Sequence, residues 1–413
     1  MFTGVASPVW WGSDRTILAR VLADRLYAEL RQLRRAPLSG PPPWLWSPAT
    51  RLDETGPDGI DSLDQLGLAT ATTELLTDGF ADLELLPASS FEAWCDAVAQ
   101  SVTQPPGRVT LRTSGTTGAQ RCVTQTLSRL EDEAAIFAAL IGPGRRRVLS
   151  ALPTHHTYGF IHAVLLPRHL APPGESPLEV IDLRSRAPAA LATLVRAGDL
   201  VLGHPLFWTA AMSGMAGGRL PNDVIGVTSS APCPDATARG LMAAGLQRLL
   251  QVYGSSETAG IGWRDDPTQP YTLLPGWYRA GAGTSDDGLC YRDEVAITAP
   301  DRLKWQADQF RVLGRRDGAV QVGGQNVIPA KVAAALSGHE AVARIAVRPM
   351  RPDEGDRLKA FVVAADPRLD PKKLEVELRR LAIACLAPAE RPGTYAFGPE
   401  IPANQMGKHA DWV

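Results

Sequence analysis

The segment from Thr113 to Gly118 carries the strongest local signal for chemistry in the sequence. It reads T-S-G-T-T-G, and its members are Thr113, Ser114, Gly115, Thr116, Thr117 and Gly118, followed by the cation Arg121. Glycines let a backbone approach an anion closely, while main-chain N–H groups and hydroxyls donate hydrogen bonds to it. The G-x-x-x-x-G-K-[ST] loop of common nucleotide hydrolases cannot be laid over this segment. It therefore predicts a polyphosphate-binding loop of another kind, and a surface turn is the structural alternative.

Four further motifs follow the loop in chain order. A P-x-x-H-x-aromatic-G stretch contains His156, and the run Y-G-S-S-E-T comprises Tyr253, Gly254, Ser255, Ser256, Glu257 and Thr258. A G-R-R-D stretch ends at Asp317, and a later Gly-Lys pair ends at Lys408. With these motifs in this order, the chain resembles the adenylate-forming superfamily, which includes acyl-CoA synthetases, luciferases and nonribosomal peptide adenylation domains.

The resemblance implies a reaction in which a carboxylate attacks the α-phosphate of ATP, giving acyl-AMP and pyrophosphate. It implies that Lys408, Ser256, Glu257 and His156 are catalytic, with Glu257 as the ligand of Mg²⁺ and Ser256 as a donor to the α-phosphate. Lys408 would stabilise the charge that develops between the two anions. Since both reactants are anionic, such a site works by positioning them and neutralising their charge.

The resemblance also assigns nucleotide contacts and a hinge. Tyr253, Gly254 and Ser255 would bind ATP together with the loop, and Asp308 and Arg315 would hold the ribose hydroxyls. Asp317 would be the pivot about which a small C-terminal domain rotates between adenylation and thioester formation.

The acid is expected to occupy a mainly apolar pocket with few polar contacts. By analogy, the candidate pocket residues are His204, Trp208, Ser229, Ser230 and Ile261. Phe207 and Trp208 are adjacent on one predicted helix, so both cannot point into one pocket, and core packing is the alternative for each. Because His204 and aromatic side chains could bind a phenol ring, the sequence favours a small aromatic acid such as 4-hydroxybenzoate.

The acceptor is predicted to be the phosphopantetheine thiol of an acyl carrier protein, because the compact outline is similar to aryl-acid ligases of arylpolyene and xanthomonadin pigment pathways. Two alternatives stay open. One is a ligase that releases a free acyl- or aryl-CoA thioester. The other is a non-catalytic scaffold that binds a nucleotide and carrier proteins.

The elements that position these residues divide into three predicted parts: a helical segment over 1–106, an α/β adenylation domain over 107–316, and a small α+β domain over 317–413. Apolar residues between Ile17 and Leu30 recur at helical spacing, and further helices are predicted to begin at Asp61 or Ser62 and at Phe91. After residue 107, short apolar runs alternate with helical stretches. This pattern predicts a layered α/β fold with a largely parallel sheet.

The stretch from Gly59 to Leu63 resembles the modification site of a carrier protein. If Ser62 carried phosphopantetheine, the protein could load itself. In the alternative interpretation, Asp61 or Ser62 caps a helix and Leu63 packs against a neighbour.

Composition limits the remaining possibilities. The chain has 413 residues, with 42 Lys and Arg against 44 Asp and Glu, so no strong field points to nucleic acid or an anionic membrane. No run of about 20 apolar residues is long enough to span a bilayer. The five cysteines are widely spaced and form no disulfide or zinc pattern. We expect a cytoplasmic enzyme that uses ATP and Mg²⁺ on a small carboxylic acid.

Overall fold

The fold is described from a computed structural model of the chain. The structure describes residues 11–34, 38–76, 90–102, 107–113, 121–215, 217–279, 288–291, 297–323, 325–351, 353–402 and 412. It divides into two compact units: unit 1 comprises Met1–Thr113 and Cys122–Trp277, and unit 2 comprises Ser114–Arg121 and Tyr278–Val413.

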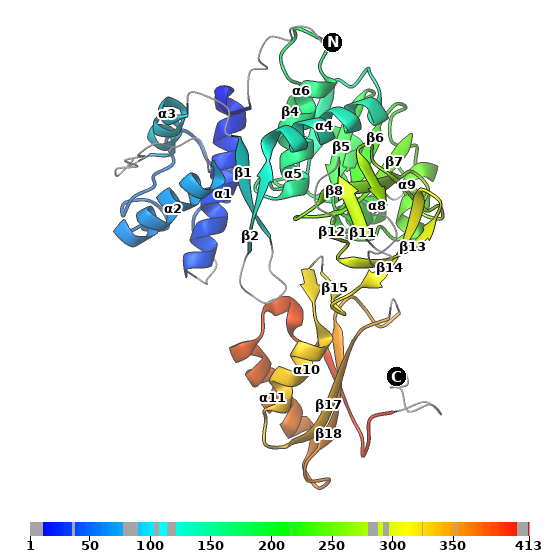
Figure 1. Cartoon of the computed structure of the whole chain (residues 1–413). Helices are drawn as coiled ribbons and strands as arrows, with labels where there is room; N and C mark the ends of the chain where they lie inside the picture. The colour runs from blue at the N-terminus through cyan, green and yellow to red at the C-terminus, as the bar shows by residue number, and fades with distance from the viewer. Residues whose placement is uncertain are drawn as a thin grey trace. The chain divides into compact units, whose positions relative to one another are not determined.

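Three helices form the N-terminal part of unit 1 (Figure 1). They are α1 (Arg15–Arg34), α2 (Ser62–Leu75) and α3 (Phe91–Ser101). Asp61 caps α2 by accepting from the backbone N–H of Asp64, whose own side chain accepts from Asp61. The predicted helix starts are therefore confirmed, and Asp61 rather than Ser62 is the cap.

A mixed sheet forms the centre of unit 1, with its strands in the order β9-β8-β7-β6-β5-β3-β4. Neighbouring strands from β4 to β7 are parallel, whereas β8 and β9 are antiparallel to their neighbours, which confirms the largely parallel sheet. The strands are β3 (Arg147–Ser150), β4 (Glu179–Asp182), β5 (Asp199–Gly203), β6 (Ile225–Thr228), β7 (Arg248–Ser255), β8 (Ala259–Arg264) and β9 (Tyr271–Leu273).

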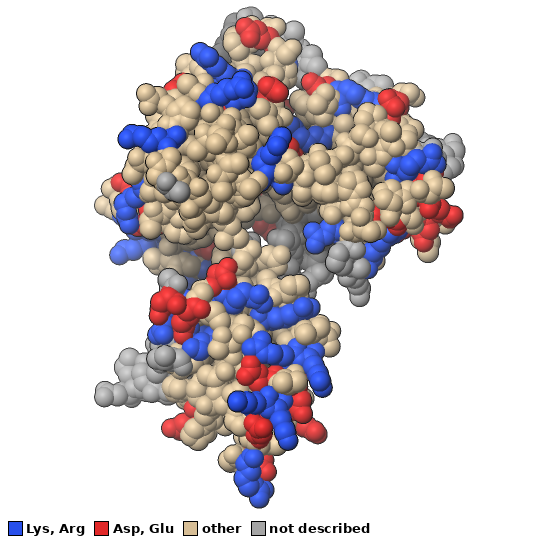
Figure 2. Space-filling view, turned by 180° about the vertical axis from the view of Figure 1, so that it is seen from behind, with Lys and Arg blue, Asp and Glu red and all other residues tan. Residues whose placement is uncertain are grey.

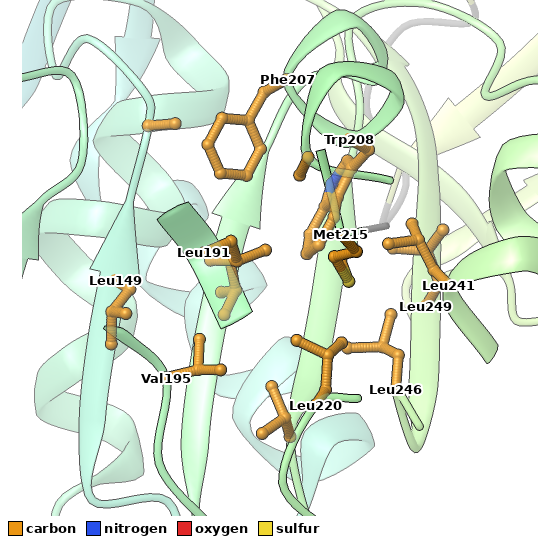
Figure 3. Close-up of a cluster of buried hydrophobic side chains, with 14 of the residues drawn as sticks. Leu149, Leu191, Val195, Phe207, Trp208, Met215, Leu220, Leu241, Leu246 and Leu249 are labelled. Atoms are coloured by element: carbon orange, nitrogen blue, oxygen red, sulfur yellow. The ribbon is translucent and has the colours of Figure 1, made fainter. Parts of the chain in front are cut away.

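Helices cover both faces of this sheet (Figure 1). On one face, a cluster of buried side chains joins β3, β5 and β7 to the helices α7, α8 and α9 (Figure 3). Residues that alternate with these along the strands, such as Val148 and Leu200, are also fully buried, as expected for a sheet packed on both sides. The helices are α4 (Leu127–Ile141), α5 (Thr157–Phe160), α6 (Leu166–Leu170), α7 (Leu191–Leu194), α8 (Pro205–Gly214) and α9 (Asp235–Ala243).

A two-stranded sheet of β1 (Arg108–Thr113) and β2 (Arg121–Thr126) precedes α4. The hydroxyls of Thr110 and Thr124 lie 2.9 Å apart across it. The alternation predicted after residue 107 therefore begins with two strands before the first helix. Residues 121–126 alternate in character and pair with β1 before the helical spacing begins.

Unit 2 contains two hairpins and a small α+β layer. The hairpins are β13 (Asp301–Gln306) with β14 (Gln309–Arg315) and β15 (Val320–Val322) with β16 (Gln325–Val327). In the layer, β17 (Val342–Pro349), β18 (Leu358–Ala364) and β19 (Thr394–Phe397) form a sheet, and α10 (Pro329–Ser337) and α11 (Pro371–Cys385) share its apolar core. The remaining short strands are β10 (Trp277–Arg279), β11 (Gly288–Tyr291) and β12 (Ile297–Thr298).

Charged side chains of both signs are interspersed on the face drawn in Figure 2, in keeping with the formal net charge of −2. Among the helices that the structure describes, we find none that is both long and apolar enough to cross a bilayer.

Candidate active site

The Y-G-S-S-E-T motif spans the end of β7 and the turn that connects it to β8. Ser255 and Thr258 lock it, since each backbone N–H donates to the other residue's hydroxyl at 3.0 and 3.2 Å. A Cβ on Gly254 would lie 2.0 Å from the carbonyl oxygen of Ala259, so only glycine fits there. Ala259 is buried at a φ of 54°, a left-handed conformation that costs a non-glycine residue free energy. The turn is thus tightly determined while the Glu257 side chain stays exposed.

A single exposed carboxylate fits Mg²⁺, which proteins usually hold through one or two carboxylates together with substrate phosphates and water. Within the described ranges, no group of three or more His, Cys, Asp and Glu side chains could hold a metal by protein ligands alone. The donor set at Glu257 is therefore suited to a magnesium ion that arrives with a nucleotide. Bound there, the ion would neutralise phosphate charge.

His156 lies at the N-terminus of α5, and its ring centroid is 4.1 Å from that of His155. Gly159 is required in this segment, because a Cβ there would lie 1.9 Å from the carbonyl oxygen of Pro153. The next turn is a π-helix, Ile161–Leu165, which places His162 inside the protein. Burial lowers the pKa of His162 to about 4, so this ring is neutral near pH 7.

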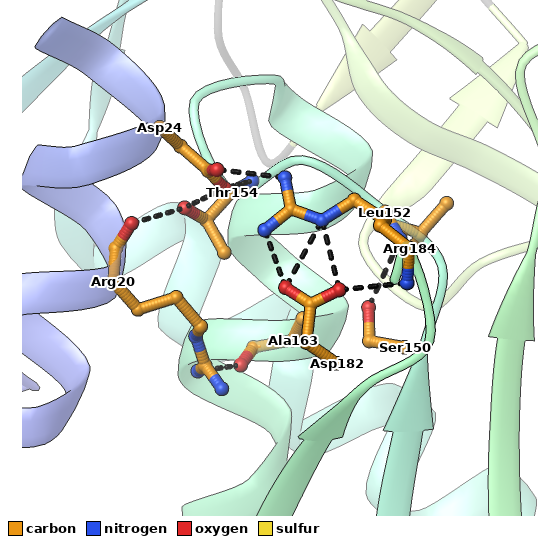
Figure 4. Close-up of polar contacts among 8 residues, drawn as sticks. All are labelled: Arg20, Asp24, Ser150, Leu152, Thr154, Ala163, Asp182 and Arg184. Atoms are coloured by element: carbon orange, nitrogen blue, oxygen red, sulfur yellow. Dashed lines mark hydrogen bonds and ion pairs between the residues drawn. The ribbon is translucent and has the colours of Figure 1, made fainter. Parts of the chain in front are cut away.

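The N-terminal helix α1 holds the segment that carries His156 (Figure 4). The buried Asp24 carboxylate accepts from the backbone N–H and the hydroxyl of Thr154, at 2.7 and 2.8 Å. Its other oxygen accepts from Arg184 at 2.6 Å, and Arg184 also pairs with Asp182 at the end of β4. Arg20, one turn before Asp24, donates to the carbonyl of Ala163 at 2.5 Å. Sequence reasoning missed Asp24, because its partner is 130 residues away.

The five predicted pocket residues do not share one environment. Trp208 is 0% exposed within the core cluster of Figure 3, and its indole N–H donates to the carbonyls of Gly203 and Val227, each at 3.2 Å. Ile261 is also fully buried, within β8. Phe207 lies in the same cluster as Trp208, so both rings pack in the core, as the alternative interpretation expected.

The polar candidates differ from these two. Ser229 is buried and donates to the carbonyl of Val252 at 3.0 Å, whereas Ser230 is exposed with a φ of 76°. His204 is half-buried and caps α8, because its Nδ1 accepts from the backbone N–H of Phe207 at 3.2 Å. Burial lowers the pKa of His204. With Nδ1 accepting, the proton of the neutral ring lies on Nε2, which makes His204 a neutral donor.

In unit 2, the G-R-R-D motif begins with the last two residues of β14 and continues past the β13–β14 hairpin. Arg315 makes a bidentate pair with Asp317 at 2.9 and 2.7 Å, and this guanidinium lowers the pKa of Asp317 to about 2. Gly314 and Gly318 adopt φ values of 123° and 70° on either side of the pair. The predicted pivot is therefore flanked by two residues whose backbone conformations favour glycine.

Asp308 and Arg315 are not brought together. Asp308 lies in the turn of the hairpin and Arg315 at the far end of β14, which is seven residues or roughly 20 Å away along an extended strand. The two side chains therefore cannot hold one ribose jointly. The residue opposite Arg315 in the ladder is Asp301, a buried carboxylate that sequence reasoning missed.

Several predicted site residues lie outside the described residues, or have only their backbone described. Thr113 ends β1 and Arg121 begins β2, but Ser114, Gly115, Thr116, Thr117 and Gly118 lie outside. Lys408 also lies outside, so its role stays a prediction. The described residues that flank its segment, Ile401 and Trp412, are buried in one cluster with Phe361, and Arg348 donates to the carbonyl of Trp412 at 2.5 Å.

This chain is similar in sequence to a known protein family. The AMP-binding enzyme C-terminal domain model matches residues 331–408. A 4-coumarate–CoA ligase of Cereibacter sphaeroides is 33% identical over 421 residues, covering 97% of each chain. Proteins of the same name from Rhodobacter capsulatus and Halorhodospira halophila are 35% and 37% identical and cover 96% and 87% of this chain, and 100% and 89% of their own length.

Solved structures with lower identity share the fold. The o-succinylbenzoate CoA synthetase MenE of Bacillus subtilis has a TM-score of 0.58 at 16% identity, covering 95% of this chain and 92% of its own. The amide bond synthetase McbA of Marinactinospora thermotolerans has a TM-score of 0.55 at 17% identity, covering 94% and 92%. The fold, the motifs and the near-full-length relatives agree: the chain belongs to the adenylate-forming family of acid–thiol ligases.

Proposed function

We propose that this chain activates a small aromatic carboxylic acid of the 4-coumarate class with ATP and transfers the acyl group to CoA. In the first step, a carboxylate oxygen attacks the α-phosphorus and pyrophosphate leaves. In the second step, the CoA sulfur attacks the acyl carbon, AMP leaves, and the thiol proton passes to solvent. The proposal rests on relatives whose names specify 4-coumarate and CoA. They are 33% to 37% identical to this chain and cover 87% to 97% of it.

The residue roles in this proposal are those that the family resemblance implies, with one change at the ribose. Glu257 would hold the magnesium ion of the nucleotide, and Ser256 would donate to the α-phosphate. Lys408 would stabilise the charge that forms between the acid and that phosphate. We assign the binding of the ribose hydroxyls to Arg315 and Asp301, and no longer to Asp308, because Asp301 is the residue paired with Arg315 across the hairpin.

The neutral Nε2–H of His204 gives a reason to expect a phenolic or carbonyl oxygen on the acid. A neutral, half-buried donor binds an uncharged acceptor with a smaller desolvation penalty than a cation would have. Replacing His204 by Phe keeps a flat ring and removes the donor. This change should weaken kcat/KM for 4-coumarate at least tenfold and leave that for cinnamate, which has no hydroxyl, nearly unchanged.

Pyrophosphate exchange with a panel of acids tests the proposal directly. We expect 4-coumarate to give the highest kcat/KM, above 4-hydroxybenzoate, benzoate and fatty acids of similar length. A preference for 4-hydroxybenzoate would favour the benzoate substrate predicted from sequence. Absence of exchange with every acid would overturn catalysis in favour of a nucleotide-binding scaffold.

The acceptor is tested by offering CoA and a phosphopantetheinylated carrier protein to the acyl-AMP form. We expect CoA to be acylated first, because the relatives are named as CoA ligases. Preferential acylation of the carrier would instead support the acceptor predicted from sequence.

Ser62 supplies a separate test of self-loading. It is exposed at the first residue of α2, beside Leu63 and Leu66, which are 75% and 65% exposed. We nevertheless expect no added mass on Ser62 after incubation with a phosphopantetheinyl transferase, since α1 and α2 are joined to the rest of unit 1 through Asp24 and the Arg25–Glu74 pair. A pantetheine mass on the native chain that is absent from Ser62→Ala would contradict this.

A further inference from the structure

Three side chains outside the sequence motifs make hydrogen bonds to the turn that carries Glu257. Gln125 is the penultimate residue of β2, and Arg129 and Glu133 are four residues apart on α4, so these two lie on one face of that helix. Their contacts are with backbone atoms of residues 256–260, which are about 130 residues later in the chain. These hydrogen bonds are therefore tertiary contacts with this one turn.

Three consecutive carbonyls of the turn accept hydrogen bonds from β2 and α4. The Gln125 amide donates to the carbonyls of Ser256 and Glu257 at 2.7 and 2.9 Å, which restrains the metal-ligand residue at its own backbone. Arg129 donates to the carbonyl of Thr258 at 3.0 Å. Gln125 is 4% exposed, so these bonds are shielded from competing water.

Gly260 is held at both its N–H and its carbonyl. Its N–H donates to both carboxylate oxygens of Glu133, at 3.0 and 2.9 Å, and its carbonyl accepts from the indole N–H of Trp277 at 2.8 Å. The Arg129 guanidinium lies 5.1 Å above the Trp277 ring, which connects the two halves of the arrangement. A Cβ on Gly260 would lie 2.6 Å from a Glu133 oxygen, so a larger residue there would displace this carboxylate.

The left-handed Ala259 explains why so many contacts are needed. An isolated alanine disfavours a φ of 54°, and such a conformation persists only where its surroundings determine it. Here the residues before and after Ala259 are both fixed from α4. Without these contacts, the turn would relax and the exposed Glu257 carboxylate would change its direction.

We propose that Gln125, Arg129 and Glu133 are positioning residues of the adenylation step, which hold the 256–260 turn so that Glu257 meets the magnesium ion of the nucleotide. This inference rests on the proposed function, in which Glu257 is that ligand. It assigns the three residues no contact with substrate. Their effect on the reaction passes entirely through the turn.

A double-mutant cycle between Gln125→Leu and Glu257→Gln tests the inference in the full chain. The readouts are pyrophosphate exchange, the Mg²⁺ concentration for half-maximal rate, and the Mg²⁺ dependence of ATP binding measured by calorimetry without turnover. Leucine keeps the volume of Gln125 and removes both donors. We expect Gln125→Leu to lower kcat between ten- and a hundredfold and to raise the Mg²⁺ requirement, with KM for the acid unchanged. In the Glu257→Gln background, the same change should cost less than threefold.

The outcomes separate the two levels of the argument. If Glu257→Gln alone leaves exchange intact, the proposed role of Glu257 fails. If Glu257→Gln lowers exchange but Gln125→Leu is silent or fully additive with it, the positioning inference is overturned. Should Gln125→Leu not fold, Arg129→Met takes its place, because methionine can still pack on Trp277 while losing the bond to Thr258.

A matched control separates positioning from general stability. Thr72→Val removes a buried hydroxyl that accepts from Trp94 at 3.2 Å within the N-terminal helices. It should lower the melting temperature without changing the Mg²⁺ requirement. An equal rise in that requirement for Thr72→Val would show that the readout follows stability, and would overturn the inference.

Discussion

The buried carboxylate of Glu133 gives the sharpest prediction, since its replacement by Gln should change how stability depends on pH. Glu133 is 7% exposed on α4, and burial raises its pKa from 4.5 to about 7. The Gly260 N–H and the Arg129 guanidinium both favour the ionised form but do not outweigh burial. Near neutral pH, the group therefore titrates in the folded protein while it is already ionised in the unfolded chain.

The sign follows from proton binding. Between pH 4.5 and 7, the folded protein holds a proton on Glu133 that the unfolded chain has released, so this group's contribution to the free energy of unfolding falls as pH rises. Complete ionisation across that interval costs roughly 3 kcal/mol. Gln resembles the protonated carboxyl, still accepts from Gly260, and does not ionise. Relative to the native chain, Glu133→Gln should therefore be about equally stable at pH 5 and roughly 2 to 3 kcal/mol more stable at pH 8.

Urea unfolding between pH 5 and 8, followed by tryptophan fluorescence, measures this difference. Glu92→Gln is the matched control, because it makes the same change of carboxyl to amide at an exposed position on α3. The reasoning is refuted if the free-energy difference between Glu133→Gln and the native chain is constant over this range, or if it falls as pH rises.

Three other changes test separate parts of the molecule. Asp24→Asn should lower the free energy of unfolding by roughly 3 kcal/mol in urea titrations, because it leaves the Arg184 cation with a weakened buried partner; an unchanged midpoint would contradict this. Ser230→Gly should raise stability by about 1 kcal/mol in the same assay, since glycine removes the cost of a positive φ, whereas Ser230→Ala should not. Lys408→Ala should abolish most pyrophosphate exchange while calorimetry finds ATP affinity nearly unchanged, and a large loss of ATP binding would show that the role of Lys408 is different.

The elements were predictable from the sequence wherever periodicity is local. The helices predicted to begin at Asp61 or Ser62 and at Phe91 coincide with α2 and α3, and the alternation predicted after residue 107 is found in the central sheet and its helices. In each case, the apolar spacing and the capping or breaking residues lie within the element itself. The motif residues were recognisable for the same reason, since each motif occupies a few consecutive positions.

The residues that hold the motifs in place left no such signal. Gln125 and Glu133 look like ordinary polar positions on a strand end and a helix, and Asp24 looks like an exposed residue of an amphipathic helix. Their importance arises from partners that are 127 to 131 residues distant, which no local pattern encodes. Asp301 was hidden by an irregularity in its own hairpin. Counting back regularly from the turn at 307–308 would place Pro300 opposite Arg315, and only the register shift between Arg302 and Leu303 brings Asp301 there.

The contacts of the N-terminal helices bear on the resemblance to a carrier protein, which depends on a short sequence around Ser62. A carrier-like segment acting on its own would need few bonds to the domain beside it. Instead, α1 places a buried carboxylate, Asp24, against Thr154 and Arg184, and α1 also contributes Arg20 to the π-helical turn that follows the His156 motif. Buried charges are costly unless they are paired, so these contacts commit α1 to the α/β core. We therefore interpret α1 as a helix that holds the segment before His156 in place. The exposed Ser62, at the start of α2, takes no part in these contacts.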